Sequence, residues 1–137
     1  RKFTKQIHKF CEANADNADM KEYVDALARL NKEWGELTMQ IGMAALKNAD
    51  EAGAAAYDYL MYSGYVTLAY FWAAAAQVAA AKLAAGTSET GFYRAKLQTA
   101  RFYYQRILPR TRMHVAAMQA GAASLLEMDE NHFLIGY

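Results

Sequence analysis

The chain has 137 residues, of which 55% are hydrophobic and 21% are charged, and its formal net charge is +1. This length suits a single globular domain, and the near-neutral charge argues against nucleic acid as the main partner, because neutralising phosphates requires a clear basic excess. The one cysteine, Cys11, excludes an intramolecular disulfide and fits a cytoplasmic location; we interpret it as a small apolar filler. Alanine makes up about a fifth of the chain and there is one proline, a composition that favours helix.

The first residue is Arg1 rather than methionine, so we expect residues 1–137 to form one helical domain cut from a longer polypeptide. A short first helix is predicted over residues 1–14. Its apolar residues recur at spacings of four and three, which places them on one helical face: Phe3, Ile7 and Phe10. After a polar turn, Asp19 and Glu22 resemble a capping box that would start the next helix.

The second helix, predicted over residues 20–48, carries the clearest pattern in the sequence. Large apolar side chains alternate between steps of four and three: Tyr23, Leu27, Leu30, Trp34, Leu37 and Ile41. This spacing is typical of the seam of a helix that packs against others in a bundle. We expect Asp50 to cap the helix that follows.

The third helix is predicted over residues 51–85, with Gly86 as the residue that stops it. Its middle, Tyr59 to Ala76, carries no charge and is long enough to be a transmembrane candidate. Tyrosine, serine and threonine dilute its apolarity, and no basic cluster flanks it. We therefore favour the central helix of a soluble bundle, apolar nearly all round, and expect no membrane partner. Small residues on this helix would let its neighbours come close: Gly64, Ala69 and Ala73.

The fourth helix is predicted as one long element over residues 89–126, kinked at Pro109 because proline removes a backbone hydrogen bond. Its apolar face is expected to include Tyr93, Leu97, Ala100, Tyr104, Ile107, Leu108, Thr111, Val115, Met118, Ala122 and Leu125. The tail is expected to dock through Phe133, Leu134 and Ile135. The predicted fold class is all-α, an antiparallel up-and-down bundle of about four helices.

Motifs for catalysis or cofactor binding are absent from the sequence. His8, His114 and His132 lie at no metal-ligand spacing, so we predict no metal site and interpret each as a surface or capping residue. There is no glycine-rich phosphate loop and no nucleophile elbow. We expect this segment alone to have no catalytic residue and no bound cofactor. The many aromatic residues of the third and fourth helices are interpreted as core and interface rather than as a ligand pocket.

The fourth helix is basic. Between Thr90 and Ser124 there is no acidic residue, and three of the six basic ones share one edge of the apolar face: Arg94, Arg101 and Arg112. One interpretation is a site for anions such as the phosphates of a nucleotide or coenzyme A. The interpretation that we favour is pairing with acids of the earlier helices, among them Glu22, Asp25, Glu33 and Glu36, or docking onto an acidic surface of a larger protein.

The stretch from Tyr93 to Phe133 resembles the end of long bacterial acyl-CoA dehydrogenases of the methylmercaptopropionyl-CoA dehydrogenase type. The matching elements are Lys96-Leu97, Ala100 to Tyr103, Ile107 to Pro109, Ala120-Gly121 and Ser124-Leu125. The stretch from Tyr59 to Trp72 is similar to the preceding helix of the same extension.

This resemblance implies a dimeric or otherwise homo-oligomeric flavoprotein of fatty acid metabolism. Such a parent enzyme uses FAD to oxidise acyl-CoA to 2-enoyl-CoA. Its catalytic base and flavin-binding residues lie upstream of the extension, and no position here matches them. The implied role is an accessory C-terminal domain that contacts the dehydrogenase core of its own chain, where it stabilises assembly or covers the acyl-CoA site. Two alternatives stay open, a stand-alone helical protein-interaction module and a membrane protein.

Overall fold

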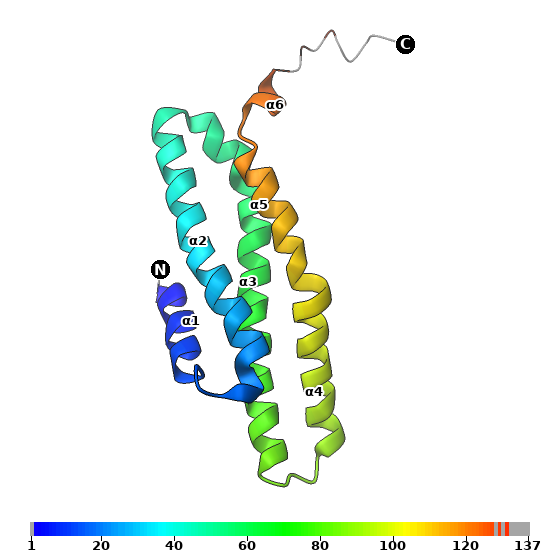
Figure 1. Ribbon diagram of the computed structural model, residues 1–137. Helices are drawn as coiled ribbons and strands as arrows, with labels where there is room; N and C mark the ends of the chain where they lie inside the picture. The colour runs from blue at the N-terminus through cyan, green and yellow to red at the C-terminus, as the bar shows by residue number, and fades with distance from the viewer. Residues whose placement is uncertain (1, 128, 130, 132–137) are drawn as a thin grey trace.

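The computed structural model describes residues 2–127, 129 and 131, and every regular element in that part of the chain is helical, as predicted. The elements are α1 (Lys2–Ala13), the 3-10 turn η1 (Ala18–Met20), α2 (Lys21–Lys47), α3 (Ala49–Ala84), α4 (Thr90–Phe102), the π turn η2 (Tyr103–Ile107), the 3-10 turn η3 (Leu108–Arg110), α5 (Thr111–Gln119) and α6 (Ala123–Leu126). Helix α3 contacts α2 on one side and α4 and α5 on another, and α1 lies against α2 (Figure 1). The tail residues Phe133, Leu134 and Ile135 lie outside the described part.

The seam predicted for α2 forms the centre of the core. Four of its six side chains are buried, and Trp34 and Ile41 are half-buried against them. Phe3 and Phe10 of α1 pack edge-on against Tyr70 of α3, with ring centroids 5.3 and 5.5 Å apart. The apolar spacing in the sequence thus identified which faces of α1 and α2 meet the rest of the molecule.

Helix α3 meets its neighbours through small side chains. Ala69, Ala73 and Ala76 are fully buried, so the backbones of adjacent helices approach closely. The prediction that Ala69 and Ala73 serve this purpose is confirmed. Gly64 does not lie at a close contact between helices, because a Cβ built on it would meet no other atom within 4 Å.

Two predicted helix starts are wrong in their capping residue. The Asn17 side chain, rather than that of Asp19, accepts a hydrogen bond from a backbone N–H, that of Asp19 at 3.1 Å. Likewise Asn48, rather than Asp50, caps α3 by accepting from the Asp50 N–H at 3.0 Å. Asparagine accepts as well as aspartate does, and in both cases it stands two residues earlier, where the backbone is extended.

The end of α3 follows the prediction. Gly86 has φ of +81°, a left-handed conformation that costs glycine little. Its N–H donates to the Leu83 carbonyl and the Thr87 N–H donates to the Lys82 carbonyl, both at 3.2 Å. These two bonds form a Schellman motif, which satisfies carbonyls that the end of the helix leaves free.

The single helix predicted over residues 89–126 is wrong. Ahead of Pro109 the backbone widens into a π turn, and the Leu108 N–H donates to the carbonyl of Tyr103, five residues back. Pro109 itself lies in a 3-10 turn, where its missing N–H leaves no α-helical bond unmade. The helix then ends at Gln119, because Gly121 turns the chain with φ of +81°. The predicted kink at Pro109 stays a prediction.

Helix α3 is also long and apolar enough to cross a membrane by length and composition, with a mean hydropathy of 1.3 over its most apolar window. A core helix of a bundle passes the same test. Only 28% of that window is buried within the described structure, so α3 is not enclosed all round as the sequence suggested.

The two conformations of glycine provide a matched test. Gly86→Ala is expected to lower the free energy of unfolding by about 1 kcal/mol, because alanine is strained at positive φ. Gly42→Ala, inside α2 with no atom within 4 Å of the new Cβ, is expected to raise it by up to about 1 kcal/mol. Urea unfolding followed by circular dichroism measures both. Two changes of the same sign would contradict the assignment of Gly86 as the helix stop.

Candidate functional site

Two of the three predicted edge arginines are already paired with acids of α2. The Arg101 Nε donates to both carboxylate oxygens of Glu22, at 3.1 and 3.3 Å. Arg112 donates hydrogen bonds from both terminal nitrogens to the Glu33 carboxylate, and its Nη1 lies 2.9 Å from Glu33 Oε2. Arg94 is exposed, and the described residues provide it with no ion pair. The favoured interpretation, pairing with earlier acids, therefore describes Arg101 and Arg112, and Arg94 is left as the free guanidinium.

The Arg112–Glu33 pair continues into the core through Tyr62. The Tyr62 ring is fully buried, and its hydroxyl lies 2.7 Å from Glu33 Oε1 and 2.8 Å from the Leu30 carbonyl. The hydrogen bonds from Arg112 hold the pKa of Glu33 below its ordinary value. Burial raises the pKa of Tyr62, so the phenol stays a neutral donor. This chain of contacts joins α2, α3 and α5.

Two further phenols, the buried Tyr103 and the half-buried Tyr104, are structural in the same sense. Tyr103 donates to the carbonyl of Tyr65 at 2.7 Å, and Tyr104 donates to that of Ala69 at 2.6 Å. Burial raises the pKa of both hydroxyls, so neither is a base at neutral pH. The interpretation of the aromatic residues as core fits these contacts. Tyr103 was missed as a core residue, although it lies three residues after Ala100 of the predicted apolar face.

His114 was predicted to be a surface or capping residue, and this is wrong. Its side chain is buried, and its Nδ1 lies 2.8 Å from Asp58 Oδ1 of α3. The contact orients the ring between Tyr57 and Tyr65, whose centroids lie 6.3 and 5.7 Å away. The sequence did contain a signal, since His114 falls three residues after the buried Thr111 and four before Met118. His8, by contrast, is exposed and pairs with Glu12 at 2.9 Å.

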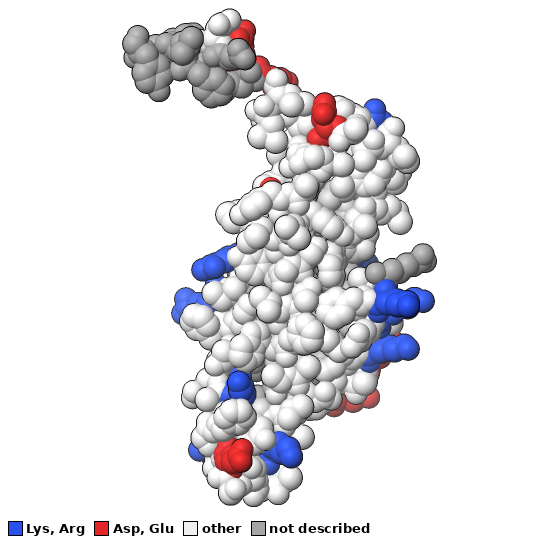
Figure 2. Space-filling model, turned by 180° about the vertical axis from the view of Figure 1, so that it is seen from behind, with Lys and Arg blue, Asp and Glu red and all other residues white. Residues whose placement is uncertain are grey.

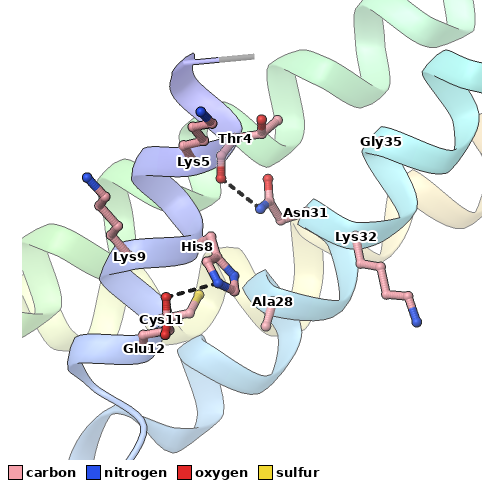
Figure 3. A pocket seen from close by; sticks show the side chains of 10 residues that line it. All are labelled: Thr4, Lys5, His8, Lys9, Cys11, Glu12, Ala28, Asn31, Lys32 and Gly35. Atoms are coloured by element: carbon pink, nitrogen blue, oxygen red, sulfur yellow. Dashed lines mark hydrogen bonds and ion pairs between the residues drawn. The ribbon is translucent and has the colours of Figure 1, made fainter.

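A groove of about 740 Å³ runs between α1 and α2 (Figure 3). Three lysines are among its lining residues, Lys5, Lys9 and Lys32, and the side chains of Lys9 and Lys32 extend away from it (Figure 3). Asn31 donates from its side chain to the Thr4 carbonyl at 3.0 Å, while its buried Oδ1 has no hydrogen-bond partner among the described residues. Cys11 lines the groove too, and burial raises the pKa of its thiol to about 11, so it is not a nucleophile at neutral pH.

Metal-ligating side chains do not gather in the described part of the chain. No group of three or more His, Cys, Asp or Glu side chains comes together there that could hold a metal ion. The groove presents lysines without a glycine-rich turn to receive a pyrophosphate.

The chain as a whole is similar to a known family of helical domains. The model of the family described as acetyl-CoA dehydrogenase C-terminal like matches residues 3–129, nearly the whole chain. The chain belongs to this family. A search of curated proteins found no significant match. This membership agrees with the resemblance seen in the sequence. A domain of this family is an accessory C-terminal part of an acyl-CoA dehydrogenase.

The network around Glu33 gives a pH-dependent prediction. Glu33→Gln is expected to lower the free energy of unfolding at pH 7 by about 1 to 2 kcal/mol, because a partly buried charged hydrogen bond is lost. The folded-state pKa of Glu33 lies below its ordinary value of 4.5, so this stabilisation is complete above pH 4.5 and is lost as the pH falls through the folded value. Urea unfolding between pH 7 and pH 3 measures it.

Glu36→Gln is the matched control, since Glu36 is exposed one turn along α2 and forms no ion pair with a described residue. It is expected to change the free energy of unfolding by less than about 0.5 kcal/mol at every pH. Equal effects of the two variants, or a Glu33→Gln effect that persists undiminished at pH 3, would contradict the network.

Proposed function

We propose that this chain is the accessory C-terminal domain of an FAD-dependent acyl-CoA dehydrogenase that oxidises acyl-CoA to 2-enoyl-CoA, and that it stabilises the assembly of that enzyme. The family match over residues 3–129 carries the proposal. The similarity of the last helices to long bacterial dehydrogenases of the methylmercaptopropionyl-CoA type supports the subtype. The flavin and the catalytic base belong to the dehydrogenase part, which the described residues do not supply.

The surface supports an assembly role. Large apolar side chains stand exposed at the end of α2, where Met39, Met43 and Leu46 are 67%, 60% and 89% exposed. Others are exposed along α3 and α4, among them Leu60 and Phe92. Clustered exposed apolar residues mark a surface that another protein surface covers. The partners that we propose are the dehydrogenase core of the same chain and further copies of it, in the cytoplasm, with no nucleic acid and no membrane involved.

A contact with coenzyme A is a second element of the proposal, and it now falls on one residue. Arg101 and Arg112 have carboxylate partners, which leaves Arg94 with its guanidinium free for a phosphate. The acyl-CoA would be held by the parent enzyme, and this domain would cover one end of the site.

The alternative function is a stand-alone, non-catalytic helical module that binds another protein. The same exposed apolar residues favour it. The two functions differ in the gene, because an accessory domain requires a reading frame that continues upstream into a dehydrogenase core. A gene that encodes these residues alone would favour the stand-alone module.

Deletion tests the accessory role. Removing this domain from the natural chain is expected to leave FAD bound but to lower the thermal midpoint by about 5 °C or more and to shift the oligomer to smaller species. Flavin absorbance, thermal unfolding and light scattering report the three properties. A truncated enzyme with an unchanged thermal midpoint and an unchanged number of subunits would overturn the proposal.

Arginine substitution tests the coenzyme A contact. Arg94→Ala in the natural chain is expected to raise KM for acyl-CoA about three- to tenfold with little change in kcat, because one charge-assisted phosphate contact is lost from both ground and transition states. Arg106→Ala, which removes an exposed arginine from the other side of the helix, is the control and is expected to leave KM unchanged. The same KM for both variants would remove Arg94 from the site.

A further inference from the structure

One side of α3 is an uncharged and largely exposed stripe. At about 100° per residue, its members fall within an arc of about 80°. They are Tyr57, Leu60, Gly64, Leu68, Phe71, Ala75 and Val78, called here the α3 stripe. Its large side chains are between 50% and 70% exposed. A row of this length and exposure is unusual for a surface that faces water.

The opposite side of α3 is the packed one. Tyr62, Val66, Ala69 and Ala73 are fully buried there, against α2, α4 and α5. Helix α3 is therefore apolar on both sides, and a helix of that kind is normally enclosed. The described residues leave most of the other side open, although Phe71 lies near Phe3 of α1 and Tyr57 lies near His114 of α5, each with ring centroids 6.3 Å apart. The view of the molecule from behind shows a broad uncharged area in the middle, with Lys and Arg at its edges and lower end (Figure 2).

We propose that the α3 stripe packs antiparallel against the α3 stripe of a second copy of this chain. The proposal deepens the assembly role given above and rests on it. The arrangement is isologous, since the same patch serves both copies, related by a two-fold axis that passes between Thr67 and Leu68.

The sizes of the side chains favour this register. An antiparallel pair centred between Thr67 and Leu68 sets Gly64 opposite Phe71 of the second copy, so a ring meets a position with no side chain. The space at Gly64 is open, since a Cβ there would meet no atom within 4 Å. The same register sets Leu60 opposite Ala75. In each of these two contacts a large residue faces a small one, and the two-fold axis repeats both contacts. Close helix packing requires such a fit.

The charges at the ends of α3 favour the same direction. Asp50, in the first turn, and Lys82, in the last turn, are both exposed, and neither forms an ion pair with a described residue. In the antiparallel pair Asp50 lies within one helical turn of Lys82 of the second copy. A parallel pair would bring like charges together. The antiparallel arrangement also sets opposite ends of the two helix dipoles side by side.

Cysteine cross-linking in the chain as its natural gene encodes it tests the register. Leu68→Cys lies beside the two-fold axis and is expected to link to its own copy. Tyr57→Cys is expected not to, because twenty-one residues at 1.5 Å each separate the two copies of this position by about 31 Å. Val78→Cys alone is likewise expected to fail, but a mixture of Tyr57→Cys and Val78→Cys chains is expected to link. Cross-linked peptides identified by mass spectrometry are the measurement.

The native thiol does not interfere with this test at neutral pH, since Cys11 is buried and its pKa is raised to about 11. Links at every single cysteine would show parallel pairing and overturn the proposal. Absence of any link between copies would also overturn it, and would assign the stripe to the dehydrogenase core, another protein or a membrane.

A pair of glycine variants separates docking from folding. Gly64→Arg fits the isolated fold, since no atom is near, but it sets a charge in the middle of the α3 stripe. It is expected to reduce the yield of the Leu68→Cys link at least tenfold. Gly35→Arg is the matched control, an equally open glycine on α2 beside the groove, and is expected to preserve the yield. Equal yields would overturn the proposal. Failure of these tests, together with a deletion that still lowers stability, would leave the accessory role standing.

Discussion

The rest of the structure depends on the close approach that α3 permits. Its inward face is lined with alanine, and Ala69, Ala73 and Ala76 are fully buried. Such small side chains contribute little apolar area, so the neighbouring helices supply the volume, through residues such as Leu27 and Leu108. A backbone that lies this near to its neighbours also exposes its carbonyl oxygens to their side chains. The apolar packing and the polar contacts therefore have one cause.

Those carbonyls are used by tyrosines. The hydroxyls of Tyr103 and Tyr104 reach the backbone of α3, and the hydroxyl of Tyr62 reaches that of α2. Each carbonyl already accepts a helical hydrogen bond and uses its second lone pair for the phenol. These bonds are directional where alanine contacts are not, so they set how each helix is shifted along its neighbour. At the rim, the pairs Arg101–Glu22 and Arg112–Glu33 tie the fourth and fifth helices to α2.

The sequence predicted what depends on local periodicity. The seam of α2, the faces of α1 and the stop at Gly86 follow from spacing and backbone preference, and the structure confirms them. The acids expected to neutralise the arginine edge included Glu22 and Glu33, but the choice among four acids depends on how the last helices are rotated against α2. For Arg112 that rotation depends on the π turn, which lies between α4 and α5, and the sequence marks the position of the proline but not the geometry of the turn. The burial of His114 was missed although its spacing from Thr111 and Met118 had indicated a place beside the apolar face.

The π turn has a consequence for how this chain tolerates changes in length. A ring closed from Leu108 to Tyr103 contains one residue more than an α-helical ring, so the turn is equivalent to a one-residue insertion absorbed within a helix. Deleting one residue there would allow a continuous α-helix up to the proline, but it would rotate everything beyond by about 100° relative to what precedes it. Arg112 and His114 would then turn away from Glu33 and Asp58 together. The extra residue of the π turn therefore sets the rotation of α5 about its own axis. Without this residue, the side chains of α5 that now contact α3 would face another direction.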